Sequence, residues 1–246
     1  MILKDISMVL ADTSRSRFYL QSLIYCNMIP SSIVLLKDED RKNMPGQIKK
    51  EDIGHESLHN IKSLWNDFNF NVWEKVDESA LRENIPCTII DTSNIHKEEV
   101  IKTIKDKSES TFIYSGFGGV ILKKKLFDTG KKFLHVHGGF LPKYKGSTTN
   151  YYSLIEDNSM GASAIILNEK IDSGPLIYRK TFLPPKDRKN IDHIYDSAVR
   201  SIVLIKTIKL YLKNRDFTFK KTESDEGELY FIIHPVLKHI AILAKD

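Results

Sequence analysis

The chain opens with an apolar run, a helical pattern and a second apolar run, and this order strongly restricts the fold. The two runs are ISMVLAD (6–12) and SSIVLLK (31–37). Between them, residues 15–28 carry apolar side chains at helical spacing, namely Leu20, Leu23 and Ile24. A strand, a helix and a second strand in one sheet make a right-handed crossover, so we expect the two strands to be parallel.

The same alternation of apolar runs and helical patterns continues along the chain. Further strands are predicted at 86–91, 110–116 and 132–137, and helices at about 57–69, 94–107 and 120–128, with Asn94 or Ser93 as a cap. Later in the chain, the pattern predicts a helix over 148–158, a hairpin-like pair of extended runs around 169–175 and a long helix over 191–212. The charged stretch 38–56 is predicted to be a mobile surface loop. The predicted fold class is α/β, a Rossmann-like, mostly parallel sheet with flanking helices and a small C-terminal helical and extended extension.

The composition is that of an ordinary soluble globular protein, with 41% hydrophobic and 28% charged residues. The net charge of +5 arises from interspersed charges, which are typical of solvated helix surfaces and suit an anionic substrate. RNA-binding signatures and long basic runs are absent from the sequence, so a nucleic-acid partner is not expected. The sequence has no apolar run as long as a membrane span and no signal-peptide pattern, so we expect a cytoplasmic protein without a membrane partner.

The stretch FLHVHGGFLPKYKG (133–146) ends a predicted strand with two histidines and two glycines. His135 and His137 are two residues apart, so on a strand their side chains project to the same face. Gly138 and Gly139 allow the backbone to turn tightly or to approach a ligand closely. Ligands of parallel α/β sheets bind beyond the carboxyl ends of the strands, so this strand end is a candidate site.

Residue types alone leave three interpretations of the histidines open. With a carboxylate such as Asp172, His135 and His137 could be the ligands of a hydrolytic metal site. One histidine could instead act as a general acid and base while the other donates to a developing oxyanion. In the third interpretation, they are hydrogen-bonded histidines without a chemical role.

The stretch HVHGGFLPKYKG resembles the signature N-x-H-P-S-L-L-P-x-Y-x-G of the folate-dependent formyltransferases, which include glycinamide ribonucleotide transformylase, methionyl-tRNA formyltransferase and the sugar N-formyltransferases. The family histidine falls on His137, and the aspartate of a downstream D-x-G turn falls on Asp172. The leucine, proline, tyrosine and glycine of the signature fall on Leu141, Pro142, Tyr144 and Gly146. The resemblance implies a catalytic domain over 1–185 and a C-terminal helix and tail, packed on that core, over 186–246.

The resemblance also implies roles for individual residues. His137 would be the acid and base of formyl transfer from N10-formyltetrahydrofolate, Asp172 would orient it, and the site would need no metal. His135 stands where the family has an asparagine and would donate to the oxyanion, and Gly138 replaces the family proline. The formyl donor would bind along SGFGGVIL (115–122) and the later turn, at Gly118, Gly119, Ile121, Asn168 and Lys170.

The amine that receives the formyl group is predicted from weaker signals. Relatives place acceptor contacts at the position of Ser147, Thr148, Thr149 and Asn150, which suit a sugar or nucleotide, although Ser147 to Thr149 also reads as a helix N-cap. The first strand ends at ADTSRSR (11–17), where the helix N-terminus with Arg15 and Arg17 could bind a phosphate. Segments 13–23 and 230–243 also resemble formyltransferase-like proteins of bacterial surface-sugar pathways, such as those that make pseudaminic acid.

The expected function is therefore N-formylation of a nucleotide-activated amino sugar in surface-glycan biosynthesis. Methionyl-tRNA and glycinamide ribonucleotide are alternative acceptors within the family. A metal-dependent hydrolase using His135, His137 and Asp172 and a non-catalytic nucleic-acid binder are alternatives of other classes. The sequence leaves a homodimer open, and it favours a structural over a catalytic role for His234.

Overall fold

The computed structural model describes residues 1–38, 61–62, 64–65, 68–189, 191–220 and 227–244. The chain folds as two compact units. The first unit comprises residues 1–48, 68–135 and 167–169, and the second comprises 49–67, 136–166 and 170–246. Most of the loop predicted at 38–56, and much of the helix predicted at 57–69, lie outside the described residues, although 61–62 and 64–65 are helical.

A parallel sheet forms the centre of the first unit. Its strands are β2 (Ile6–Ala11), β4 (Ile33–Lys37), β5 (Cys87–Asp91), β6 (Thr111–Ser115) and β7 (Lys132–His137), in the order β7-β6-β2-β4-β5. Strand β2 pairs with both β4 and β6 in parallel, which confirms the parallel strands predicted from the first apolar runs. A short parallel pair, β1 (Ile2–Leu3) and β3 (Ile29–Pro30), lies outside this sheet.

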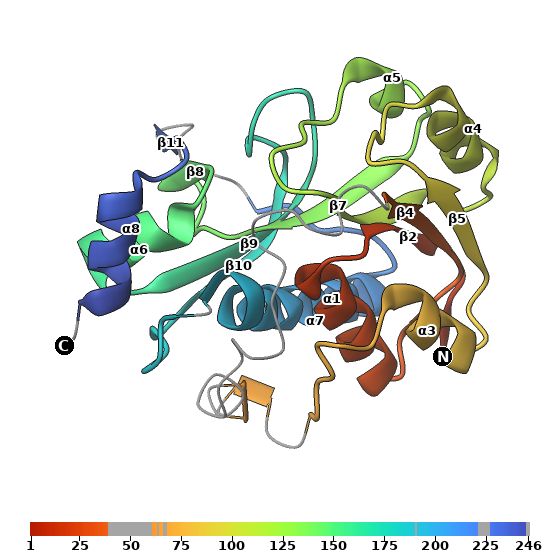
Figure 1. Ribbon diagram of the computed structural model, residues 1–246. Coiled ribbons are helices and arrows are strands. Elements are labelled where there is room, and N and C mark those ends of the chain that lie inside the picture. Colours follow the sequence, from red (N-terminus) through yellow and green to blue (C-terminus); the bar gives the residue numbers. More distant parts are fainter. Residues whose placement is uncertain (39–60, 63, 66–67, 190, 221–226, 245–246) are drawn as a thin grey trace. The chain divides into compact units, whose positions relative to one another are not determined.

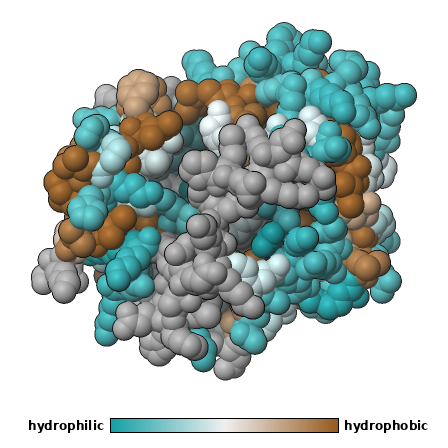
Figure 2. Space-filling model, viewed as in Figure 1, coloured by the Kyte–Doolittle hydropathy of each residue, from teal (hydrophilic) through white to brown (hydrophobic). Residues whose placement is uncertain are grey.

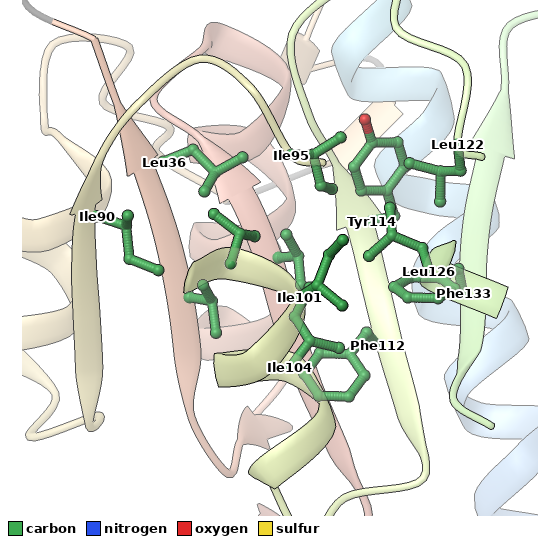
Figure 3. Packing of buried hydrophobic residues seen from close by; sticks show 13 residues of the cluster. Leu36, Ile90, Ile95, Ile101, Ile104, Phe112, Tyr114, Leu122, Leu126 and Phe133 are labelled. Atoms are coloured by element: carbon green, nitrogen blue, oxygen red, sulfur yellow. The ribbon is translucent and has the colours of Figure 1, made fainter. Parts of the chain in front are cut away.

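Helices cover both faces of this sheet (Figure 1). Helices α1 (Ser14–Tyr25) and α3 (Val76–Arg82) lie on one face, and α4 (Glu98–Asp106) and α5 (Lys124–Phe127) lie on the other. Figure 3 shows the core beneath α4, where Ile101 and Ile104 point toward Phe112 of β6. This α/β arrangement with a mostly parallel sheet is the predicted fold class.

The predicted start of helix α4 is wrong. The helix begins at Glu98 rather than near Asn94, because the Asn94 side chain accepts a hydrogen bond of 2.9 Å from the amide of His96. Asparagine readily makes this local turn, which competes with helix initiation. Helix α5 is likewise shorter than its predicted range of 120–128.

The second unit contains an antiparallel hairpin with helices. Strands β9 (Met160–Ile166) and β10 (Leu176–Phe182) pair antiparallel, as predicted, and α7 (Asp196–Asn214) packs against them after a π-helical turn, η3 (Ile191–Tyr195). Helix α6 (Thr149–Asp157) packs against α8 (Pro235–Leu243), and His234 caps α8 by accepting from the Val236 amide. This capping is the structural role expected for His234.

A short parallel pair joins the C-terminal segment to the histidine-containing stretch. Strand β11 (Glu228–Tyr230) pairs with β8 (Tyr144–Gly146), which the sequence did not predict. The segment from β11 through α8 exposes large apolar side chains, namely Leu229, Phe231, Ile232, Val236, Leu237, Ile240 and Leu243. The surface at the left of Figure 2, where Figure 1 places α8, is partly brown.

Candidate active site

His137 is a buried histidine at the end of β7, with only 5% of its surface exposed. Its Nε2 lies 2.7 Å from the carbonyl oxygen of Tyr144 and 3.4 Å from Oγ1 of Thr149. A carbonyl oxygen only accepts, so Nε2 carries a proton and donates to Tyr144. The Thr149 hydroxyl donates to the carbonyl of Gly138 at 2.6 Å, which leaves its oxygen to accept from the imidazole.

Asp172 lies at the other nitrogen of the same ring. Its Oδ2 is 3.3 Å from Nδ1 of His137 and accepts a hydrogen bond of 2.8 Å from the amide of Gly146. Asp172 adopts a left-handed backbone conformation (φ 47°), which aspartate and asparagine tolerate better than most residues. The structure thus brings together the histidine and the aspartate that the sequence motif paired.

The surroundings of His137 act on its pKa in opposite directions. Burial, the largest influence, lowers the pKa because the charged ring loses its hydration. Asp172 opposes this by attracting the imidazolium, and Arg200 adds to the lowering by repelling it. The net pKa lies below the ordinary value, so the free protein holds a neutral His137 at pH 7, with a carboxylate beside Nδ1 that can stabilise an added proton.

His135 is half-buried in the first unit, where its Nδ1 lies 3.3 Å from the carbonyl oxygen of Tyr114. This carbonyl can only accept, so the neutral ring carries its proton on Nδ1 and its Nε2 is an acceptor. Donation from Nε2 to an oxyanion would therefore require the imidazolium form of His135. The oxyanion role predicted for this residue remains a prediction, and it is now tied to the charge of the ring.

The residues predicted to hold the formyl donor lie at exposed turns. In the first unit, Gly118 and Gly119 are exposed, and a Cβ added at either would meet nothing within 4 Å, so the backbone is accessible to a flat ring. Ile121 is 54% exposed and Asn168 is exposed. Lys170 is exposed in the second unit. An open backbone with an exposed apolar side chain fits the ring of a folate, and the roles of all of these residues remain predictions.

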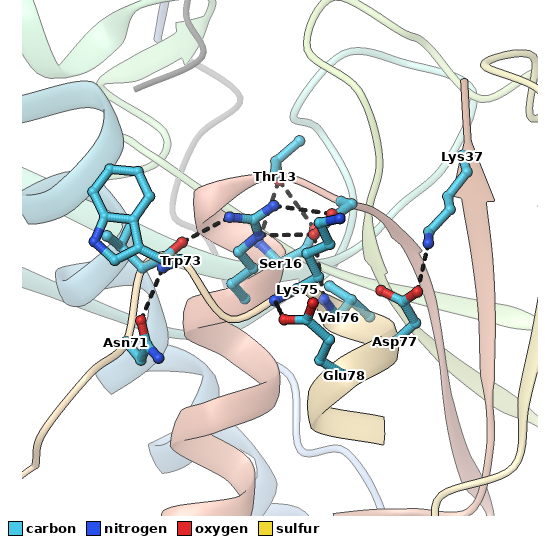
Figure 4. A network of polar contacts seen from close by, with 12 residues as sticks. Thr13, Ser16, Lys37, Asn71, Trp73, Lys75, Val76, Asp77 and Glu78 are labelled. Atoms are coloured by element: carbon cyan, nitrogen blue, oxygen red, sulfur yellow. Dashed lines mark hydrogen bonds and ion pairs between the residues drawn. The ribbon is translucent and has the colours of Figure 1, made fainter. Parts of the chain in front are cut away.

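Arg15 lies in the first turn of α1, as the phosphate hypothesis requires, and it makes internal contacts. Its guanidinium donates to Oγ of Ser115 at 3.0 Å and to the carbonyl of Gly116 at 2.7 Å. Figure 4 shows the neighbouring network, in which Thr13 caps α1 by accepting from the Ser16 amide. Arg17, the other arginine of this turn, forms an ion pair with Asp12 and donates to the Val72 carbonyl.

The residues predicted to contact the acceptor differ in exposure. Thr149 and Asn150 are 2% and 4% exposed, and Asn150 lies 3.4 Å from a carboxylate oxygen of Asp192. Thr148 has a left-handed conformation (φ 51°) at the N-cap of α6 and makes no side-chain cap bond. Ser147 precedes it. These buried contacts give Thr149 and Asn150 structural partners inside the second unit, and acceptor binding by this segment remains a prediction.

The C-terminal segment binds the loop at Ser147 and Thr148. This contact was not predicted from the sequence. The amide of Ser147 donates to the carbonyl of Tyr230 at 2.9 Å, and the amide of Ile233 donates to Oγ1 of Thr148 at 2.9 Å. The rings of Tyr230 and Tyr152 lie 4.4 Å apart between centroids. The contact was not predicted because the donor of each bond is a backbone amide, which leaves no signal in the sequence.

The described residues hold no group of three or more histidine, cysteine, aspartate or glutamate side chains arranged to bind a metal ion. Within the same described ranges, no helix is both long enough and apolar enough to cross a membrane.

Comparison with known proteins places this geometry in a family. The formyl transferase family model matches residues 31–197, more than half of the chain. Methionyl-tRNA formyltransferase of Pelagibacter ubique (strain HTCC1062) is 30% identical over 176 residues, which are 63% of this chain and 56% of that relative. The chain spans about half the length of the curated relatives that it matches first.

Two solved structures share the fold. A sugar N-formyltransferase from Shewanella sp FDAARGOS_354 superposes with a TM-score of 0.58 at 14% identity, covering 97% of this chain and 86% of that one. WlaRD, a sugar 3N-formyl transferase in the presence of dTDP and 5-N-formyl-THF, superposes with a TM-score of 0.54 at 16% identity, covering 92% and 69%. The match over residues 31–197, which includes His137 and Asp172, shows that this chain belongs to the formyl transferase family.

Proposed function

We propose that the protein is a folate-dependent N-formyltransferase that moves the formyl group of N10-formyltetrahydrofolate to the amino group of a nucleotide-activated amino sugar. The observation that carries this proposal is the contact of His137 with Asp172, in which Oδ2 lies 3.3 Å from Nδ1. The family match supports formyl transfer, and the exposed backbone at Gly118 and Gly119 supports a binding surface for the donor.

The reaction requires one new bond, one broken bond and one proton transfer. The acceptor amine forms a bond to the formyl carbon, the bond from that carbon to N10 breaks, and a proton passes from the amine to N10. His137 is neutral at pH 7, because burial lowers its pKa, and it can accept this proton. Asp172 stabilises the resulting imidazolium, and His137 then returns the proton.

The developing negative charge on the formyl oxygen needs hydrogen-bond donors. A single well-placed donor contributes about 10²–10³-fold in rate in other enzymes. A neutral His135 has one N–H group, on Nδ1, and donates it to the Tyr114 carbonyl. His135 can therefore donate from Nε2 to the formyl oxygen only when the ring is charged. The contribution of His135 thus requires the imidazolium form of its ring.

A nucleotide sugar is proposed over the other acceptors because of the hydroxyl, amide and aromatic groups between Ser147 and Tyr152 and the arginine at the first helix start. Both structures compared above belong to sugar formyltransferases. Sequence relatives that act on methionyl-tRNA support that acceptor as the second candidate.

An acceptor panel tests the proposal. The purified protein is incubated with N10-formyltetrahydrofolate and one acceptor at a time. The sugar acceptors are CMP-, UDP-, GDP- or dTDP-linked amino sugars and amine precursors of a nonulosonic acid such as pseudaminic acid. The other acceptors are methionyl-tRNA and glycinamide ribonucleotide. Mass spectrometry should show the addition of one formyl group to an amino sugar. Formylation of the tRNA or the ribonucleotide alone would show that the proposed sugar acceptor is wrong. If the protein neither binds folate nor transfers a formyl group to any acceptor, the proposed enzymatic activity is refuted.

A further inference from the structure

An ion pair from helix α7 reaches the backbone beside His137. Nε of Arg200 lies 2.7 Å from Oδ2 of Asp196, and the two side chains are only 15% and 7% exposed. Arg200 also donates from Nη1 to the carbonyl of Val136, at 3.0 Å. Val136 directly precedes His137 on β7, so one guanidinium connects α7 to the strand end that carries the imidazole.

The glycine that follows His137 leaves room for this ion pair. A Cβ at Gly138 would lie 2.2 Å from Nη2 of Arg200 and 2.9 Å from Oδ1 of Asp196, closer than real Cβ contacts come. Any side chain there, including the proline of the resembled motif, would displace the guanidinium. Glycine at position 138, where the motif has proline, therefore leaves the space that the guanidinium of Arg200 occupies.

The same pair adds charge to the surroundings of His137. The charged groups that act on the ring are Asp172 from the turn before β10 and Asp196 with Arg200 from α7. Uncharged contacts come from the Tyr144 carbonyl and the Thr149 hydroxyl. Both carboxylates favour the imidazolium, and Arg200 is the cation that opposes them.

We propose that Arg200, held by Asp196, is a positioning residue for His137, which fixes the end of β7 and balances the negative charge of Asp172. The guanidinium suits both tasks because its planar fork can bind a carboxylate and a carbonyl at once and stays charged at any working pH. A lysine would retain the charge without the fork. The catalytic consequence of this role rests on the proposed function, whereas its electrostatic consequence does not.

The electrostatic part is tested without any substrate. NMR titration of the histidine rings measures the pKa of His137 in the full chain, in the wild type and in Arg200→Met. Removing the cation leaves Asp172 and Asp196 unopposed, so the pKa should rise. Lys206→Met is the matched control, because it removes one positive charge from an exposed position of the same helix and should leave the pKa of His137 where it is.

Two further variants separate charge from position and allow for misfolding. Arg200→Met leaves a buried carboxylate without its partner, so Arg200→Met with Asp196→Asn serves if the single variant fails to fold in a thermal melt. The double variant should bring the pKa of His137 back toward the wild-type value. Arg200→Lys should also keep that pKa near the wild-type value, yet lower kcat by about tenfold through loss of the fork, with KM little changed.

The measured pKa and kcat values of these variants test the two parts of the role proposed for Arg200. If folded Arg200→Met shows the same His137 pKa as Lys206→Met, the charge balance is refuted. If Arg200→Lys retains full kcat, the positioning role is refuted. If the wild type transfers no formyl group to any acceptor, the proposed function fails, while a raised pKa in Arg200→Met would still establish the electrostatic coupling.

Discussion

Asp172 holds one carboxylate oxygen 3.3 Å from Nδ1 of His137, and the same oxygen accepts a hydrogen bond from the amide of Gly146. The carboxylate is thereby fixed by backbone on one side and faces the imidazole on the other. The Tyr144 carbonyl engages the opposite ring nitrogen, so the orientation of His137 is set from both sides. A histidine held in this way can gain and lose a proton without moving.

Asp172→Asn should lower kcat by about 10²–10⁴-fold, because the amide cannot stabilise the charged form of His137 as a carboxylate does. The protein should stay folded, since asparagine tolerates the left-handed conformation of this residue and can still accept from Gly146. Steady-state kinetics and a thermal melt measure the two effects. The exposed Asp157→Asn is the control, and equal activity of both variants would contradict the assigned role.

His135→Asn should keep substantial activity, because an asparagine amide always offers N–H donors whereas neutral His135 uses its proton on the Tyr114 carbonyl. The measurement is kcat at pH 7 beside that of His137→Ala, which should lose most activity but still bind folate. Less activity in His135→Asn than in His137→Ala would show that His135 has a role that an amide cannot fill.

Gly146→Ala should destabilise the protein more than a glycine-to-alanine change at an unhindered turn. Gly146 has φ 99°, and a Cβ there would lie 2.1 Å from the carbonyl of Tyr230 in β11. Gly130→Ala is the matched control, because Gly130 also has positive φ (75°) but nothing within 4 Å of the added Cβ. The control should cost about 1 kcal/mol of unfolding free energy and Gly146→Ala about 1–3 kcal/mol more. Denaturant unfolding measures both, and equal costs would mean that β11 is not seated on β8.

Lys238→Met should reduce stability at neutral pH and have no effect in acid. Lys238 of α8 lies 2.8 Å from Oδ2 of Asp192. Burial acts to raise the pKa of Asp192, but hydrogen bonds from Lys238 and Tyr151 outweigh it, so the pKa lies below 3.8. A lowered carboxylate pKa gives stability that is present above the unfolded value and lost as the pH falls through the folded value.

Both side chains of this pair are more than a third exposed, so the loss at pH 7 should be at most about 1 kcal/mol. Urea unfolding from pH 7 down to pH 3 should show the difference between wild type and variant shrinking toward zero. The exposed Lys209→Met should leave the whole profile unchanged. A difference that is the same at both ends would show that the ion pair is not its source.

The sequence predicted the strands of the first unit's parallel sheet well, because each is a local apolar run. Strand β7, for example, occupies the predicted range 132–137, and its last residue is the histidine of the motif. Helix α4 was misplaced at its start because Asn94 can form a turn as readily as a cap. The choice between these two local structures depends on packing that a propensity does not contain.

The pairing of His137 with Asp172 could be predicted because both are chemically distinctive side chains in a spaced motif. The Tyr144 carbonyl could not, since every residue has one. Asp196 and Arg200 look like an ordinary i, i+4 surface pair on a helix, and only the fold shows that they are buried against Gly138. The bonds from Tyr230 to the loop at Ser147 depend in the same way on two segments distant in sequence.

Transfer of a ¹³C-labelled formyl group by the wild type and by His137→Ala tests the central claim most directly. Each protein is mixed with labelled N10-formyltetrahydrofolate and the nucleotide-linked amino sugars, and the label on the sugar amine is followed by mass spectrometry. The account predicts labelled N-formyl sugar with the wild type and a loss of most of that rate in a variant that still binds folate. Equal transfer by both proteins would contradict a reaction centred on His137.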